Sequence, residues 1–445
     1  MSSKRLFVLL TPLIISLSVS VILLWPGIFD NDSLNQWEQI STGTFSNNHP
    51  IIHTLLMYPF ARAHWPAGFS ILQSSAFLLT TIYVARVFRS HLNAIGITAI
   101  VITIALNPAI GISLATFWKD TLFAILLIVT GTILVDVYKK PDRVLHTYRF
   151  FFIAASIFFV ASIRHNGIFA ALVISAIIMF LHSNTAKYAC IFALILCLLT
   201  PHILRASSVS PKHIPFINYS MLHILSGYAI ANPKDVKLAE FIKPFLNEIE
   251  ISEFNPEGSN WLVLNPSANH LLIRSQFSNL FWRFIYVFTH DPYAVSNLIT
   301  EGARLGLYLN RNPKIGVYYY QLPSLHPAYP LAFSQSPQLE QYSSMLERNV
   351  SHNPSRLFWP PIALLAIILG SLLFTRKKRE LLLFSTPSLV TYFTVLWVLP
   401  GQDYRYFLYL LYLAPFLLGL LISEGTSAIN IALIHALKPL EERER

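Results

Sequence analysis

Long, nearly uninterrupted runs of hydrophobic residues dominate this chain, and short polar segments separate them. A helix needs about 17 to 25 apolar residues to cross a bilayer, and shorter runs are tolerated where the helix lies beside protein. By this measure the sequence predicts ten transmembrane helices. They cover residues 6–25, 66–88, 93–107, 121–138, 149–163, 167–182, 187–204, 357–375, 380–399 and 404–422.

Two further segments interrupt this series of spans. Residues 50–62 are apolar but short, and they contain Pro50 and Pro59, so we expect a helix that lies at the membrane interface. Residues 205–356 form a polar stretch between the seventh and eighth spans, in which clusters of Pro, Asn and Ser alternate with helix-like segments. This stretch is long enough for a compact domain. The predicted fold is therefore an α-helical polytopic membrane protein with a large, mostly helical outer domain.

The domain organisation follows from these boundaries. Residues 1–204 are expected to form an N-terminal bundle of seven spans, which includes a first outer loop at residues 26–65. Residues 205–356 form the outer domain, residues 357–422 the last three spans, and residues 423–445 a cytoplasmic tail. Lys4 and Arg5 before the first run imitate a signal peptide, but no small-residue cleavage site follows, so this run is predicted to remain as a span.

The composition supports a membrane protein and excludes several other classes. Hydrophobic residues make up 54% of the chain and charged residues only 12%, whereas a soluble globular protein carries about 25% charged residues. These values exclude a soluble enzyme, a nucleic-acid-binding module, a disordered scaffold and a disulfide-rich miniprotein.

The distribution of Lys and Arg predicts the orientation. With the N-terminus in the cytoplasm, the cytoplasmic segments contain 16 of the 32 Lys and Arg residues, and the short outer loops contain four. This asymmetry follows the positive-inside rule and explains the net charge of +10 without nucleic acid. Both termini are predicted to be cytoplasmic.

The residues able to perform chemistry gather on the predicted outer side. Five acids fall on the short outer loops, together with four cations and four histidines. These are Asp30, Asp32, Glu38, Asp120, Asp403, Arg62, Lys119, Arg164, Arg405, His49, His53, His64 and His165. Ionisable groups at a membrane are costly and usually face a cavity or a partner, so the sequence predicts an outward-facing polar pocket.

The first outer loop supports two interpretations. Asp30 and Asp32 lie two residues apart, and one carboxylate beside another makes a general base plausible. Alternatively, Asp32 or Ser33 is the N-cap of an interfacial helix, with Gln36 a few residues further on.

The other outer loops leave similar alternatives open. Lys119 and Asp120 form either a self-neutralised pair or a phosphate contact. Arg164, His165 and Asn166, followed by Gly167, form either a simple hairpin turn or part of a polar site.

In the last outer loop, Asp403 and Arg405 either pair with each other or belong to the site. The tyrosines around them suit an aromatic belt at the membrane surface. There is no Walker loop, HExxH, GxSxG or Cys/His zinc spacing. We also expect no buried Asp or Glu in the central spans, which argues against an ion-coupled transporter.

These motifs together resemble those of the bacterial polytopic glycosyltransferases of the GT-C fold, in particular the membrane glucosyltransferases that decorate O-antigen and other surface glycans. The shared motifs are Asp32-Ser33, Gln36-Trp37, His49-Pro50, Asn107-Pro108, Trp118-Lys119-Asp120, Arg164-His165-Asn166-Gly167, Phe281-Trp282, His290-Asp291-Pro292-Tyr293 and Asp403-Tyr404-Arg405-Tyr406. The motifs are short, and the likeness extends along the whole chain.

The resemblance implies a GT-C-like bundle in the bacterial inner membrane that transfers a sugar, glucose or another hexose, from polyprenyl phosphate to a glycan acceptor on the periplasmic face. It favours Asp32 over Asp30 as the catalytic base. The residues expected to bind the substrate or its phosphate are His49, Lys119, Asp120, Arg164, His165, Asn166, Asp403 and Arg405. No metal or other cofactor is required, although a divalent cation is compatible with the reaction. The alternatives are a lipid-linked sugar flippase or transporter, and a non-catalytic component of glycan assembly.

Overall fold

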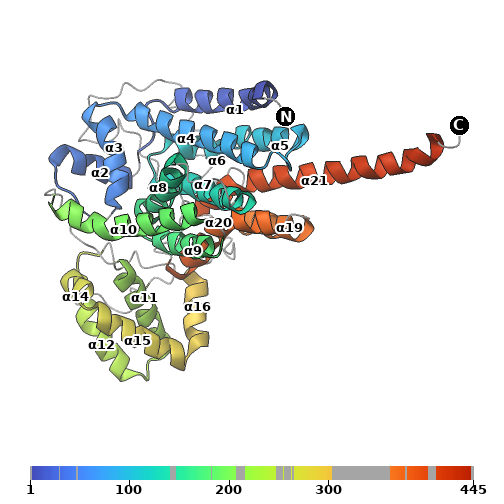
Figure 1. The fold of residues 1–445 in the computed structure, drawn as a ribbon. Coiled ribbons are helices and arrows are strands. Elements are labelled where there is room, and N and C mark those ends of the chain that lie inside the picture. Colours follow the sequence, from blue (N-terminus) through green and yellow to red (C-terminus); the bar gives the residue numbers. More distant parts are fainter. Residues whose placement is uncertain are drawn as a thin grey trace.

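The computed structural model describes residues 3–29, 31–46, 49–140, 147–181, 183–206, 216–246, 254, 262, 265–302, 361–375, 378–398 and 407–441. The regular secondary structure of these residues is α-helical, and an isolated β-bridge joins Ile28 to Thr116. In Figure 1 most long helices run roughly side by side, and a smaller group of helices lies against the bundle.

The bundle consists of helices from both ends of the chain. Its helices are α1 (Ser3–Leu23), α4 (Pro66–Val87), α5 (Ala94–Ala105), α6 (Pro108–Ala115), α7 (Lys119–Lys139), α8 (Thr147–Ile163), α9 (Gly167–Phe180), α10 (Asn184–Ala206), α19 (Pro361–Phe374), α20 (Lys378–Val398) and α21 (Leu408–Glu441). Two short helices, α2 (Asn31–Thr42) and α3 (Ile51–Arg62), lie at the end of the bundle that contains the N-terminus of α7.

Several of these helices suit a membrane. Five of them, α1, α4, α7, α10 and α21, are long and apolar enough to cross a bilayer, and the bent pair α5–α6 makes a sixth candidate. Helices α8, α9 and α19 contain shorter apolar segments. Each predicted run coincides with a helix, so the described chain fits a multi-pass helical membrane protein, and the number of ten spans stays a prediction.

Two helix boundaries differ from the prediction. The run 93–107 does not continue straight into an outer loop, because α6 follows α5 at an angle of 63°. Pro108 cannot continue the backbone hydrogen bonding of α5, and the side chain of Asn107 caps α6 by accepting a hydrogen bond from the Ala109 N–H at 3.0 Å. Helix α21 also extends past residue 422 to Glu441, into the segment expected to be a tail.

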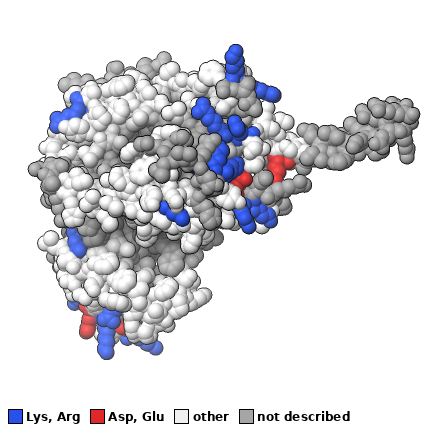
Figure 2. All heavy atoms as spheres, viewed as in Figure 1, with Lys and Arg blue, Asp and Glu red and all other residues white. Residues whose placement is uncertain are grey.

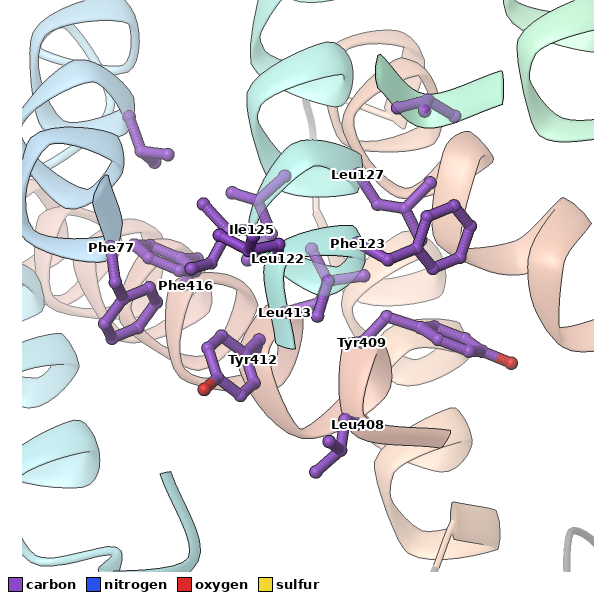
Figure 3. Packing of buried hydrophobic residues seen from close by; sticks show 14 of the residues in the cluster. Phe77, Leu122, Phe123, Ile125, Leu127, Leu408, Tyr409, Tyr412, Leu413 and Phe416 are labelled. Carbon is purple, nitrogen blue, oxygen red and sulfur yellow. The ribbon is translucent and has the colours of Figure 1, made fainter. Parts of the chain in front are cut away.

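At the centre of the bundle, α7 packs against α21 and α4. Figure 3 shows Phe123 and Leu127 of α7 beside Tyr409 and Leu413 of α21, with Phe77 of α4 on the other side. Lipid tails are as apolar as these side chains, so close van der Waals packing stabilises such contacts more than escape from water does.

Glycines allow one especially close contact, between α5 and α21. A Cβ at Gly419 would lie 2.6 Å from the carbonyl oxygen of Gly96, and a Cβ at Gly96 would lie 2.5 Å from that of Gly419. Small residues at such a contact allow two backbones to approach, as is common between helices in membranes.

Ion pairs connect the helices at the opposite end of the bundle, where the sequence predicts the cytoplasm. Glu380 of α20 accepts hydrogen bonds from Lys139 of α7 at 2.7 Å and from His91 at 2.8 Å. Asp136 of α7 lies 3.4 Å from Arg149 of α8. On the face shown in Figure 2, Lys and Arg side chains gather beside the base of α21, and a wide uncharged surface lies next to them.

A second hydrophobic core lies within residues 216–302. Its helices are α11 (Phe216–Ala231), α12 (Val236–Leu246), α14 (His270–Ser275), α15 (Phe277–His290) and α16 (Pro292–Gly302). Their buried side chains form a cluster that is separate from the core of the bundle. We call this group the small domain. Helix α16 packs against α20 and connects it to the bundle.

Candidate functional site

A short β-bridge joins the first outer loop to the segment before α7. The Ile28 N–H donates to the Ala115 carbonyl at 2.9 Å, and the Phe117 N–H donates to the Ile28 carbonyl at 3.0 Å. Gly27 precedes the bridge with φ +119°, where a Cβ would lie 2.5 Å from the Phe117 ring. Only glycine suits this backbone conformation and this space.

Helix α4 holds the same segment from the other side. The Gln73 amide donates to the carbonyls of Leu114 and Thr116, both at 3.0 Å. The ring of Phe117 packs edge-on against Phe29 and Phe69, with centroids 4.5 and 5.4 Å away. These contacts fix the start of α2 relative to the start of α7.

Asp32 and Lys119 meet as a result. Helix α2 begins at Asn31, so Asp32 lies within its first turn, and neither Asp32 nor Ser33 is the N-cap. Gln36 does not complete a capping box, because its amide donates to Thr54 at 2.8 Å. The Asp32 Oδ2 accepts a hydrogen bond from the Lys119 Nζ at 2.8 Å.

The Asp32 site is partly open to solvent. The carboxylate side chain is 26% exposed. His49, which precedes α3, lies with its Nδ1 3.9 Å from the same Oδ2. We call Asp32, Lys119 and His49 the Asp32 cluster. A positively charged partner favours the ionised form of a carboxylate, which is the form that accepts a proton.

Asp120 does not pair with its neighbour Lys119, contrary to one of the two interpretations of the sequence. Its Oδ1 lies 2.8 Å from the Arg164 Nη1, and the two side chains are only 1% and 7% exposed. Adjacent residues of a helix point in different directions, so Lys119 and Asp120 face different partners. Asp120 is therefore a buried residue in the first turn of α7 and not a loop residue.

The turn between α8 and α9 supplies one partner of the buried ion pair. The Arg164 side chain extends from this turn into the bundle, where its guanidinium lies 5.6 Å from the centre of the Phe123 ring of α7. His165 is exposed and Asn166 is half-buried. The Asp120–Arg164 ion pair thus attaches the turn to the N-terminal end of α7.

His53 is one of the outer histidines that the sequence analysis named, but it was not among the residues expected to bind the substrate. Its ring is buried in α3, and its Nδ1 lies 3.1 Å from the Gln36 Oε1. Burial, and then the positive charges of Lys119 and His49, lower the pKa of His53 to about 3. The ring is therefore neutral at physiological pH and connects α2 to α3 beneath the Asp32 cluster. In the sequence, His53 differs from the other outer histidines only in lying within an apolar segment.

The remaining predicted site residues lie outside the described residues. These are Asp30, Asp403 and Arg405. Among the residues that the structure describes, no three His, Cys, Asp or Glu side chains are grouped so that they could hold a metal ion. Comparison with protein-family models, with curated proteins and with solved structures gives no significant match to this chain.

Proposed function

We propose that this protein is a membrane glycosyltransferase that moves a hexose from polyprenyl phosphate to a glycan acceptor. In this proposal the chain crosses a bacterial inner membrane ten times in a GT-C-like bundle, with both termini in the cytoplasm. The Asp32 cluster then faces the periplasm, and the segment 205–356 forms the periplasmic domain.

The observation that supports this proposal best is the partly exposed Asp32 carboxylate hydrogen-bonded to Lys119. A general base needs an ionised carboxylate that a substrate hydroxyl can reach. A group that stabilises a departing phosphate needs positive charge close to that base. Asp32, Lys119 and His49 bring both properties together at one end of the bundle.

The proposed reaction is a single displacement. Asp32 accepts the proton of an acceptor hydroxyl, and the hydroxyl oxygen forms a bond to the anomeric carbon of the donor sugar. The bond from that carbon to the phosphate oxygen breaks, its electron pair stays on the phosphate, and the anomeric centre inverts. Lys119 and His49 stabilise the developing negative charge, and the resemblance adds Arg405. Asp120 balances the charge of Arg164, so we assign this pair to positioning α7 and not to the phosphate.

Replacement of Asp32 tests the function directly. The purified protein in lipid nanodiscs should transfer a radiolabelled hexose from polyprenyl phosphate to a glycan fraction. The Asp32→Asn variant should lose about 10² to 10⁴-fold in rate, because an amide cannot accept the proton. Glu38→Gln is the matched control, since Glu38 is an exposed acid on the same helix, and it should retain activity.

The outcome also separates the alternatives. A flippase or a non-catalytic assembly component has no need for this one carboxylate, so full lipid-linked sugar export by Asp32→Asn would favour them. Asp30→Asn is the second control, and a large loss at position 30 with little at position 32 would assign the base to Asp30. Near-normal transfer by the double Asn variant would refute a base in this loop.

A further inference from the structure

The small domain carries an exposed stripe of aromatic and uncharged polar side chains. One face of α15 packs into the domain core through Leu280 and Val287, both buried. The opposite face and the start of α16 carry the stripe, which consists of Asn279, Trp282, Tyr286, Thr289, His290 and Tyr293. Trp282 is 66% exposed and Tyr293 77% exposed.

The exposed rings are held by their neighbours. The Trp282 ring meets Phe281 edge-on, with centroids 5.3 Å apart. The Tyr286 ring lies 3.9 Å from the ring of His290, whose Nδ1 is 2.8 Å from the Tyr286 carbonyl oxygen. A surface whose rings are already restrained loses little conformational entropy when it binds a partner.

The stripe contains no Asp, Glu, Lys or Arg. Arg283 borders the stripe, and its guanidinium lies 5.0 Å from the centre of the Phe241 ring of α12 and 6.0 Å from the centre of the Tyr286 ring. A helix that lies on a lipid surface is rich in Lys and Arg on its polar face, whereas α15 contains a single Arg, Arg283, and no Lys. The stripe therefore suits an uncharged partner that has both apolar faces and hydroxyl groups. Sugar rings have both, since their C–H faces stack on aromatic rings and their hydroxyls bond to amide, hydroxyl and imidazole groups.

We propose that this stripe binds the acceptor glycan, in an uncharged form, along the axis of α15. Trp282 and Tyr286 lie one helical turn apart, about 6 Å along the axis, so that Trp282 stacks on one sugar unit and the Tyr286 hydroxyl bonds to the neighbouring one. Asn279, Thr289 and His290 bond to their hydroxyls. Helix α16 continues from this stripe to the bundle, where it packs against α20. The role as acceptor site rests on the proposed function, whereas glycan binding itself does not.

Glycan binding by the full chain in nanodiscs tests the proposal. The probe is the set of neutral oligosaccharides released from the surface polysaccharide of the cells that make the protein, and saturation-transfer NMR gives the affinity. The double variant Trp282→Ala, Tyr286→Ala should bind at least about tenfold more weakly, since exposed aromatic anchors commonly contribute this much. Trp282→Phe should retain binding, because it keeps a ring. Leu271→Ala is the matched control, since it removes an 81% exposed apolar side chain of the same domain outside the stripe.

Three results would overturn the proposal. The wild-type protein would fail to bind the oligosaccharides, or the double variant would bind them as well as the wild type does. The third result is quenching of Trp282 fluorescence by nitroxide groups on lipid acyl chains, because it would place the stripe in the bilayer. The wild-type signal minus that of Trp282→Phe isolates this tryptophan.

The transfer assay distinguishes a failure of this proposal from a failure of the proposed function. Binding that depends on the stripe in a protein without transfer activity would refute only the glycosyltransferase. Active transfer with an unchanged acceptor KM in the double variant would refute only the stripe. Asp32→Asn should bind the oligosaccharides as well as the wild type does.

Discussion

At the residue scale, two neighbouring side chains at the start of α7 contact different partners in different environments. Lys119 contacts Asp32, whose carboxylate is partly exposed, and Asp120 contacts Arg164 inside the bundle. A partly exposed pair can exchange its partner for a substrate at little cost. A buried pair cannot, because either charge alone would be left in a poorly solvating environment.

Removal of one member of the buried pair should destabilise the protein strongly. Arg164→Met leaves the Asp120 carboxylate buried without its main counter-charge, and loss of one partner of a buried pair costs about 3 to 5 kcal/mol. The double variant Asp120→Leu, Arg164→Met should regain most of this loss, because neither charge remains. Thermal unfolding in detergent measures both. A single variant as stable as the wild type would contradict the structural role of this pair.

His53 should make stability depend on pH. An unfolded histidine has a pKa of about 6.5, and the folded pKa of His53 is about 3, so between these values the unfolded chain binds one more proton. Stability should therefore fall as the pH drops below about 6.5, by up to about 1.4 kcal/mol per pH unit.

The control for this pH dependence is His53→Leu. Its unfolding midpoint should be lower at neutral pH, since Gln36 loses a hydrogen bond. Between pH 6 and pH 4, however, it should change less steeply than that of the wild type. Parallel pH profiles would show that His53 does not cause the dependence.

At the scale of elements, the site depends on how two loops are joined. The bridge between Ile28 and Thr116 sets the distance between α2 and α7, and therefore the contact between Asp32 and Lys119. Neither helix contains this information, because the two residues lie 87 positions apart in the chain.

Substitution of Gly27 should disrupt the site without touching its charged residues. In Gly27→Ala the new Cβ would lie 2.5 Å from the Phe117 ring at a φ of +119°. We expect a loss of about 1 to 3 kcal/mol from the strained backbone, and a clear loss of transfer activity as Asp32 moves away from Lys119.

Gly43→Ala is the matched control for Gly27. Gly43 also has a positive φ, of +72°, but a Cβ there would meet nothing within 4 Å. This variant should lose about 1 to 2 kcal/mol from its backbone conformation and should keep its activity. Equal activity losses in the two variants would show that strain alone matters and not the bridge.

At the scale of the whole molecule, charged groups gather at the two ends of the bundle. The Asp32 cluster and the Asp120–Arg164 pair lie at one end, and the ion pairs of Glu380 and Asp136 lie at the other. The apolar helices between them suit a bilayer, so the side that each end faces determines which substrates can reach Asp32.

Single cysteines should reveal this orientation. In a Cys197→Ser background, Asp142→Cys and Lys377→Cys should be protected from a membrane-impermeant thiol reagent on intact cells, and Glu257→Cys should be labelled. These three positions lie outside the described residues, and their expected sides follow from the distribution of Lys and Arg. Labelling at position 377 together with protection at position 257 would show the opposite orientation and remove the argument for a periplasmic site.

The sequence alone predicted the helical class and the positions of the long apolar helices, because a run of apolar residues of membrane length has few other stable conformations. It also predicted that Asp32, Lys119, Asp120 and Arg164 lie at one end of the bundle, since alternating spans bring every second loop to the same side. These predictions depend on hydrophobicity and order along the chain, which the sequence contains directly.

Only the tertiary structure decided which of these charges contact each other. It pairs Lys119 with Asp32 and Asp120 with Arg164, it adds the buried His53, and it bends the chain between α5 and α6. The physical reason is that an ion pair needs a separation of only a few ångströms. That separation depends on the bridge, the aromatic contacts around Phe117 and the direction in which each helical residue points, and none of these can be read from spacing along the chain.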